Sequence, residues 1–202
     1  MTTRSVGEPV IRSEDPRLLS GGGRYLDDLG QDALEVAFVR TPHAHARVVD
    51  IDVSAALEVD GVVAVYTYDD LLESDETEGT HVAEPLPLLI PHPGLHAPRT
   101  PYALAKDEVN HVGEAVVMVV ARNRYLAEDA CQRIVVEYDP LPPVVGLDAS
   151  REAAHAVHQD VPDNIAAQVL QEVGDVESAL ASAPHTLTLE LFVERSASMP
   201  ME

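Results

Sequence analysis

The sequence predicts an α+β fold in which short strands outnumber helices. Over several short runs, apolar residues alternate with polar ones, which is typical of half-buried strands. One segment after Asn123 has its apolar residues at helical spacing instead. The apolar fraction is 46%, but aromatic residues make up only 4% and Trp is absent, so the core must consist mainly of Val, Leu, Ile and Ala.

The first part of the chain predicts a lead segment followed by strands. Residues 1–33 are rich in Gly, Arg and Asp and lack periodicity, which favours an extended lead with turns. Residues 34–39 alternate, with Leu34, Val36 and Phe38 on one face, and predict a half-buried strand. Further elements are expected in order: a strand over residues 49–53, a short helix over 55–57 capped by Ser54, and a strand over 62–66 after Gly61.

Residues 69–101 are expected to form a long solvated loop. Carboxylates gather over residues 69–84, and six prolines follow between Pro85 and Pro101. Proline lacks the N–H that a strand ladder or a helix interior needs, so neither structure suits this stretch. Strands resume directly after it, which places the loop inside one domain.

The second part predicts a buried strand, a helix and two further strands. The apolar run 115–121 is typical of a central strand. Asn123 is expected to cap a helix, and residues 135–138 to form the next strand. The apolar residues of this helix form one stripe: Leu126, Ala127, Ala130, Cys131 and Ile134. Residues 147–163 are acidic and lack periodicity. A short helix is expected from Gly174 to Leu180.

The last predicted strand, residues 186–193, has no obvious partner in the chain. Leu187, Leu189, Leu191 and Val193 alternate strictly with the residues between them. The strand follows a linker and has no hairpin partner beside it. It therefore requires a sheet that this chain lacks.

The charge balance excludes several classes of function. Thirteen basic residues stand against 35 acidic ones, a formal net charge of −22. Nucleic-acid binding needs Lys and Arg to displace phosphate counterions, and an anionic membrane surface repels so acidic a chain. The start of the chain lacks the apolar run of a signal peptide and no stretch approaches a membrane span, so a cytoplasmic protein is expected. Cys131 is the only cysteine and is expected to be a buried, inert thiol.

Two motifs invite a chemical interpretation, and each has a structural alternative. The glycines of 21–23 suggest a phosphate loop, but no strand precedes them, which favours a turn. His43 and His45 could share a metal, but no third ligand has usable spacing, which favours a structural pair. The other histidines considered are His81, His92, His96, His111, His155 and His158, and they are scattered through expected loops.

An ordered set of short motifs carries more information than any one of them. It comprises GEPVIR (7–12), EDPRLLSG (14–21), GRYLDD (23–28), VRTPHAHA (39–46), DID (50–52), GV (61–62), VGEAV (112–116), AEDA (127–130), VEY (136–138), LP (141–142), Asn164, Gly174, Asp175, Arg195 and PME (200–202). Together they closely resemble the N-terminal part of the molybdopterin-binding large subunit of the xanthine dehydrogenase, aldehyde oxidase and carbon monoxide dehydrogenase family.

The resemblance implies a domain organisation. Residues 1–19 would be an extended lead, 20–140 the α/β hammerhead domain of that family, and 141–163 a linker. Residues 164–202 would open the molybdenum-cofactor-binding region, which agrees with the unpartnered strand near the C-terminus.

The resemblance also implies that the chemistry lies elsewhere. The family's cofactor and substrate residues lie downstream of the matched region, so no catalytic residue, cofactor-binding residue or metal ligand is assigned to this chain. The assembled enzyme would use molybdopterin-bound molybdenum, with iron–sulfur clusters and FAD on other chains or domains. His43 and His45 match a family motif that we interpret as structural.

Two functions remain open from the sequence. In the first, the chain is the hammerhead-bearing portion of a molybdenum hydroxylase and acts as scaffold for a cofactor-bearing partner chain, other subunits or a second copy of itself. In the second, it is a free-standing interaction or small-ligand-binding module that keeps the fold without the enzyme.

Overall fold

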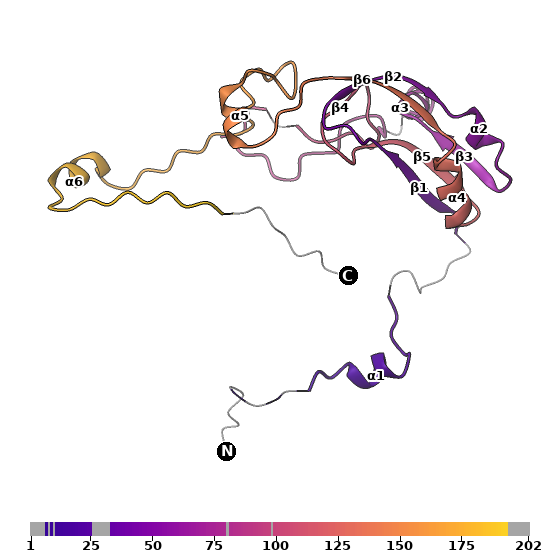
Figure 1. Ribbon diagram of the computed structural model, residues 1–202, viewed down its shortest axis with the longest axis horizontal. Helices are drawn as coiled ribbons and strands as arrows, with labels where there is room; N and C mark the ends of the chain where they lie inside the picture. The colour runs from indigo at the N-terminus through magenta and orange to yellow at the C-terminus, as the bar shows by residue number, and fades with distance from the viewer. Residues whose placement is uncertain are drawn as a thin grey trace. The chain divides into compact units, whose positions relative to one another are not determined.

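Strand β5 (Ala115–Ala121) lies between β1 (Glu35–Arg40) and β3 (Val62–Tyr66) in an antiparallel sheet, which confirms the predicted central strand. The structure is a computed structural model that describes residues 7, 9, 11–25, 33–79, 81–97 and 99–193. It divides into two units: Ala33–Ala181, and Met1–Asp32 together with Ser182–Glu202. The larger unit holds both sheets (Figure 1).

A second antiparallel sheet has β2 (Ala46–Asp52) in its centre, with β4 (Glu108–Val109) on one side and β6 (Val135–Pro140) on the other. The register of β2 against β6 shifts between Val48 and Asp50. Such a bulge turns one side chain out of the alternating pattern, and Val49 is accordingly 61% exposed. The sequence predicted a strand over residues 49–53, whereas the observed strand begins earlier, at Ala46, and ends at Asp52.

The core lies on one face of β5. Val117, Val119 and Ala121 alternate along this strand and are completely buried. Val117 packs in a cluster with residues of β2, β4 and β6, whereas Val119 and Ala121 pack with α2 (Ser54–Leu57) and α4 (Arg124–Cys131). The second sheet and two helices thus cover the same face of the first sheet, and the fold is α+β as predicted.

Helix α4 confirms its sequence prediction. The side chain of Asn123 accepts a hydrogen bond from the backbone N–H of Leu126 at 3.0 Å, which satisfies one of the free donors at the helix start. Ala127 and Ala130 are completely buried against the sheet. Helix α2 begins differently from the prediction, because Ser54 is its first residue and not its cap. The backbone N–H of Ser54 donates to the carboxylate of Asp52.

Strand β1 confirms its position but reverses its predicted face. Val36 and Phe38 are 44% and 40% exposed, whereas Ala37 and Val39 pack into the core clusters. Helix α4 lies directly against β1. Ala37 packs in the same cluster as the buried alanines of α4, and its small side chain suits this close approach.

Residues 69–101 are not one continuous loop, because α3 (Tyr68–Glu78) occupies the start of this stretch. One carboxylate oxygen of Asp70 accepts both the backbone N–H and the hydroxyl of Thr67, at 2.6 and 2.7 Å. This contact resembles a capping box, and the acidic residues of the first turn complement the helix dipole. The described residues beyond α3 up to Pro101 form no helix or strand beyond a single bridge, Leu95 to Ala167.

Two further short helices correct the sequence interpretation. The lead contains α1 (Asp15–Leu19), and the stretch expected to be loose contains α5 (Leu147–Glu152). Gly21 has a φ of +74°, and the N–H groups of Gly21 and Gly22 donate to the carbonyls of Leu18 and Arg17. These bonds form a Schellman motif, so the glycines of 21–23 end a helix, as the turn interpretation required.

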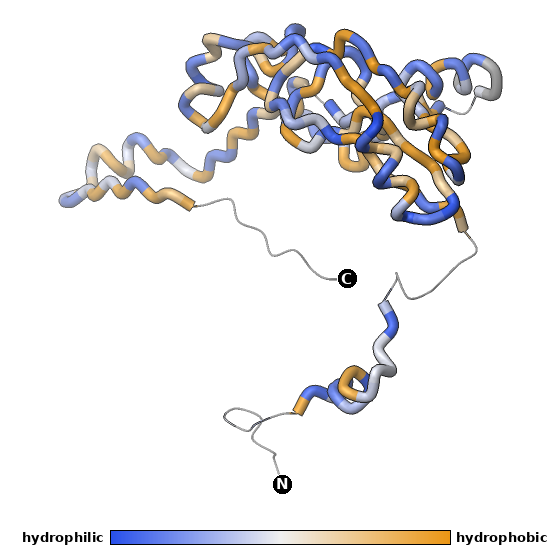
Figure 2. Tube along the Cα trace, turned by 45° about the vertical axis from the view of Figure 1, so that its right-hand side comes forward, coloured by the Kyte–Doolittle hydropathy of each residue, from blue (hydrophilic) through white to orange (hydrophobic). Residues whose placement is uncertain are grey.

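The expected short helix near the C-terminus is α6 (Val176–Ser182). Beyond it, residues 186–193 run without a ladder partner and are not a strand, which corrects the prediction. In Figure 2 the described tube ends here in hydrophobic colour. The physical reason is the one that the pattern raised: a strand needs a neighbour to satisfy its N–H and C=O groups.

Candidate functional site

The histidine motif of 39–46 lies where β2 begins, and its second histidine is buried. His45 is 9% exposed. Its Nδ1 atom lies 3.1 Å from the carbonyl oxygen of Pro142, so this nitrogen carries a proton and donates. Its Nε2 atom has no hydrogen-bond partner among the described residues and lies 3.7 Å from a carboxylate oxygen of Glu108.

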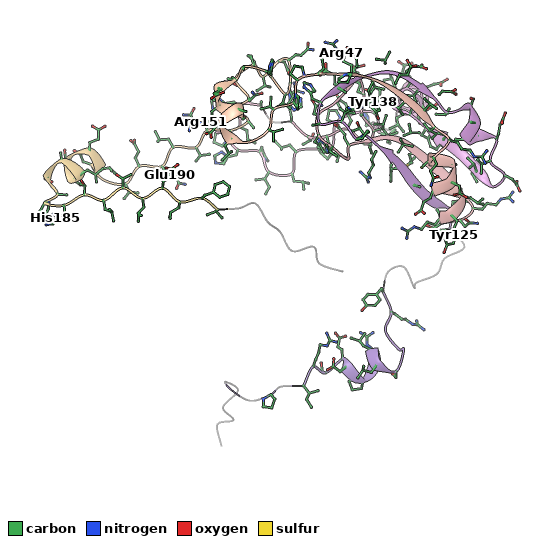
Figure 3. All side chains as sticks on the ribbon, in the orientation of Figure 1. Arg47, Tyr125, Tyr138, Arg151, His185 and Glu190 are labelled. Carbon is green, nitrogen blue, oxygen red and sulfur yellow. The ribbon has the colours of Figure 1, made fainter. Side chains whose placement is uncertain are left out.

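The first histidine of the pair has different partners. The ring of His43 packs against that of Tyr138 with centroids 4.8 Å apart, and its backbone N–H donates to the hydroxyl of Thr41. Burial raises the pKa of Tyr138, and the Thr41 hydroxyl opposes that shift. Figure 3 shows Tyr138 on the ribbon of the second sheet. The arrangement gives each histidine a packing role at the corner between β1 and β2.

Glu108 is the centre of a charge cluster that the sequence did not reveal. Its carboxylate lies 3.7 Å from Nε of Arg47 and accepts a hydrogen bond from the side chain of Gln159 at 3.2 Å. Arg47 also pairs with Asp139 of β6 at 3.3 Å. A loop far along the chain is thereby tied to the edge of the β2–β4 pair.

That loop, residues 155–168, contacts other parts of the larger unit at several points. Arg99 forms an ion pair with Asp160, and the N–H of His96 donates to the carbonyl of Ala166 at 2.9 Å. Asn164 holds the loop's own shape, because its side chain accepts from the N–H of Val157 and donates to the carbonyls of residues 150 and 155. Asn164 has a φ of +56°, a conformation that asparagine tolerates better than most residues.

A cavity of about 640 Å³ lies between this loop and β4. Its lining mixes charges: Asp107, Glu108, Glu114, Asp160, Arg99, Lys106, His111 and His158. Burial, followed by the positive charge of Arg99, lowers the pKa of His158. The cavity is open to solvent, and four carboxylates face two permanently cationic side chains in its lining, so its charge balance disfavours an anionic ligand.

Of the remaining candidate histidines, His111 and His158 share the lining of the cavity, whereas His81 and His92 have separate local partners. His81 pairs with Glu84, His111 lies 3.5 Å from Glu114, and the ring of His92 accepts the N–H of Gly94. Within the described ranges no group of three or more His, Cys, Asp or Glu side chains could hold a metal ion. Cys131 is half-buried, and burial raises its pKa, which disfavours the reactive thiolate.

The C-terminal segment of 186–193 presents its apolar side chains to solvent. Leu187, Leu189, Leu191 and Val193 are 84%, 71%, 81% and 83% exposed. Four such side chains in an extended, unpaired segment form a surface that a soluble domain normally covers.

Comparison with known proteins decides the family. The family model described as "Aldehyde oxidase and xanthine dehydrogenase, a/b hammerhead domain" matches residues 20–142. The chain belongs to this family. The resemblance read from the ordered motifs is thereby confirmed, although Glu8, Val10, Leu26, Asp27, Asp28, Arg195 and residues 200–202 of those motifs lie outside the described residues.

Relatives of this hammerhead family member align over most of its length. The nicotine 6-hydroxylase large subunit of Paenarthrobacter nicotinovorans is 38% identical over 100% of this chain and 24% of its own. The carbon monoxide dehydrogenase large chain of Afipia carboxidovorans is 34% identical over 76% of this chain and 18% of its own. The crystal structure of quinoline 2-oxidoreductase from Pseudomonas putida 86 has a TM-score of 0.68 and 35% identity, covering 90% of this chain and 22% of that one.

The hammerhead chain therefore spans about a quarter of the length of these curated relatives. The chain carries the hammerhead domain of this family, its relatives are named as large subunits of a hydroxylase and of dehydrogenases, and the comparisons do not favour the free-standing module. No helix among the described residues is long and apolar enough to cross a membrane.

Proposed function

We propose that this chain is a non-catalytic scaffold that completes the fold of a cofactor-bearing partner chain in a molybdenum hydroxylase. The observation that carries the proposal is the exposed segment 186–193, in which Leu189 is 71% exposed and has no ladder partner. A strand with one apolar face is stable only against a sheet edge and an apolar layer. Relatives four times as long would supply both from their remaining length.

The domain assignment forms part of the proposal. Residues 20–140 would be the hammerhead domain, 1–19 its lead, 141–163 a linker, and 164–202 the opening of the cofactor-binding region. The family match over residues 20–142 supports the bounds of the hammerhead domain, 20–140. The contacts of the 155–168 loop with Arg99 and Glu108 mean that the linker would also be anchored to the hammerhead domain.

The family uses molybdopterin and other cofactors, and the residues present here do not suit that group. Molybdopterin carries a phosphate, whereas the lining of the 640 Å³ cavity has four carboxylates, of Asp107, Glu108, Glu114 and Asp160, against only two permanent cations, Arg99 and Lys106. This excess of carboxylates would oppose an anionic ligand. We infer that catalytic residues, cofactor ligands and metal ligands all lie on the partner chain, and that the complex works in the cytoplasm.

The spectrum of the chain alone checks the cofactor proposal. With one cysteine, Cys131, the chain lacks the four thiolates that an iron–sulfur cluster normally takes. We expect a featureless visible spectrum and no stoichiometric molybdenum or iron by metal analysis. A flavin band, or either metal at one equivalent, would contradict the proposal.

Co-purification of the tagged chain with the downstream part of a family large subunit, supplied as a separate chain, tests the scaffold role. Leu189→Asp should abolish assembly, because the charge faces the apolar layer that the strand needs. Thr188→Asp introduces the same charge on the alternate side and should reduce assembly far less. Burying each leucine of this face contributes roughly 1.5–3 kcal/mol, so one substitution is enough to be measured.

A thermal melt of each variant separates assembly from folding. Leu189→Asp should leave the melting temperature of the isolated chain unchanged, since Leu189 is already exposed. If Leu189→Asp unfolds the whole chain, the segment belongs to the core and the two-part organisation fails. If assembly is untouched, the scaffold has lost its proposed contact.

A further inference from the structure

The first sheet has an outer face that no helix covers within the described part of the chain. The face consists of two rows, each made of three residues that lie opposite one another on β1, β5 and β3. One row is Val36, Val120 and Ala64, and the other is Phe38, Met118 and Tyr66. We call these six residues the outer apolar face.

Exposure separates this face from the inner one. Val36, Phe38 and Tyr66 are 44%, 40% and 37% exposed, whereas Val117, Val119 and Ala121 on the inner face are completely buried. Met118 and Val120 are half-buried between the exposed edge residues. A continuous apolar patch across three strands is uncommon on a monomer and typically marks a contact with another protein surface.

A cation borders the patch. The guanidinium of Arg40 lies over the Phe38 ring, 5.4 Å from its centroid, and donates one hydrogen bond to the carbonyl of Gly113 at 2.8 Å. Stacking and this single bond fix the guanidinium at the rim of the face, and its five N–H donors leave capacity for a carboxylate opposite. The rim therefore favours an acidic group on whatever covers the face.

We propose that the outer apolar face is a second docking surface for the cofactor-bearing chain, through an apolar patch with a carboxylate opposite Arg40. This inference rests on the proposed function. A second copy of this chain suits the face less well, because each copy carries a net charge of −22 and the two would repel. The relatives, in which three quarters of the length lies outside the matched region, provide the protein surface that the patch lacks here.

The test compares Phe38→Glu with Tyr125→Glu in the same co-purification and in a titration of affinity. Tyr125 is 79% exposed on α4, the helix that packs on the opposite face of the sheet (Figure 3). Phe38→Glu should weaken assembly by about tenfold or more, and Tyr125→Glu by less than about twofold, as expected for a buried aromatic anchor against a free surface residue. Arg40→Met should give an intermediate loss.

Circular dichroism and a thermal melt establish that each variant is folded. If Phe38→Glu does not fold, Phe38→Thr removes the ring and places a β-branched residue, which favours the strand, at the same position. Equal losses for the Phe38 and Tyr125 variants would overturn the docking surface.

Three other results would also overturn it, and they can be told apart. If Leu189→Asp blocks assembly but the Phe38 variants do not, this inference fails while the proposed function stands. If the wild-type chain does not assemble with the cofactor-bearing chain, the proposed function fails first. If the chain alone is a dimer that Phe38→Glu dissociates, the occupant is a second copy.

Discussion

The imidazole of His45 and the carbonyl of Pro142 are 97 residues apart in sequence and 3.1 Å apart in space. The contact joins the residue just before β2 to the chain just after β6, and the N–H of Leu141 donates to the carbonyl of His45 beside it. A buried histidine thus fastens the corner of the second sheet, which explains a histidine at this position without a metal or a proton transfer.

Removing this side chain should destabilise the larger unit. His45→Ala loses the hydrogen bond to Pro142 and leaves a cavity, so we expect the free energy of unfolding to fall by about 2 kcal/mol. Urea denaturation followed by circular dichroism measures it. His185→Ala, at an exposed position, is the control and should change little. Equal effects for the two variants would refute the role of His45.

The cap of α4 gives a second prediction. Asn123→Ala removes the acceptor for the N–H of Leu126 and should lower the free energy of unfolding by about 1 kcal/mol. Asn123→Asp keeps an acceptor and should stay near the wild-type value. Thermal melts of the three proteins compare them, and a loss for Asn123→Asp as large as for Asn123→Ala would contradict the capping explanation.

Backbone geometry at Gly61 gives a third prediction. Gly61 has a φ of +92°, and a Cβ there would lie 2.6 Å from Cδ1 of Leu126. Gly146 has a similar φ of +87° but open space around it. Backbone strain should cost roughly 1–3 kcal/mol at either position. Gly61→Ala should destabilise more than Gly146→Ala, because it must also displace the side chain of Leu126. Similar losses at both positions would show that the contact with Leu126 is unimportant.

The pH dependence of stability gives a fourth prediction. His158 has a lowered pKa in the folded chain because of burial and then of Arg99, while Glu114 and Glu108 act in the opposite direction and His45 adds to the lowering. The unfolded chain therefore takes up this proton at a higher pH than the folded chain. The free energy of unfolding should accordingly fall as the pH drops below the ordinary histidine value of 6.5.

Urea denaturation across this range checks the sign, and His158→Gln is the comparison. The variant should lose less stability than the wild type between about pH 7 and pH 5.5, because only the difference between the two curves belongs to His158. Identical curves, or a steeper fall in the variant, would contradict the assignment.

The elements with the strongest patterns were predictable from sequence. The apolar run of β5 can be buried only in the centre of a sheet, and the apolar stripe of α4 only by packing one helix face on the core. Both elements lie where the pattern predicted them. Strand β1 shows the limit. Alternation identifies a strand and two faces, but Ala37 turns inward because α4 needs close approach, which depends on a helix far along the chain.

The acidic composition of residues 69–84 led to a wrong prediction, because a local hydrogen bond between Thr67 and Asp70 starts a helix there. The carboxylates after Thr67 suggested a solvated loop, yet the spacing from Thr67 to Asp70 is a helix-start signal and α3 begins there. Glu108 could not be identified as a cluster centre, because its partners come from β2 and from the loop of Gln159. Such a meeting depends on strand order, which no short motif encodes.

The pairing of β1 with β5 and of β2 with β6 has a consequence for how the chain is made. Glu35 pairs with Ala121, and Asp52 with Val135, so neither sheet can close until residues 115–140 have left the ribosome. Topologies with such distant pairings fold slowly, because the loop must close before the contacts form. During synthesis the nascent strands β1, β2 and β3 therefore emerge without the strands they pair with in the folded chain, so their apolar residues are exposed until β5 and β6 follow.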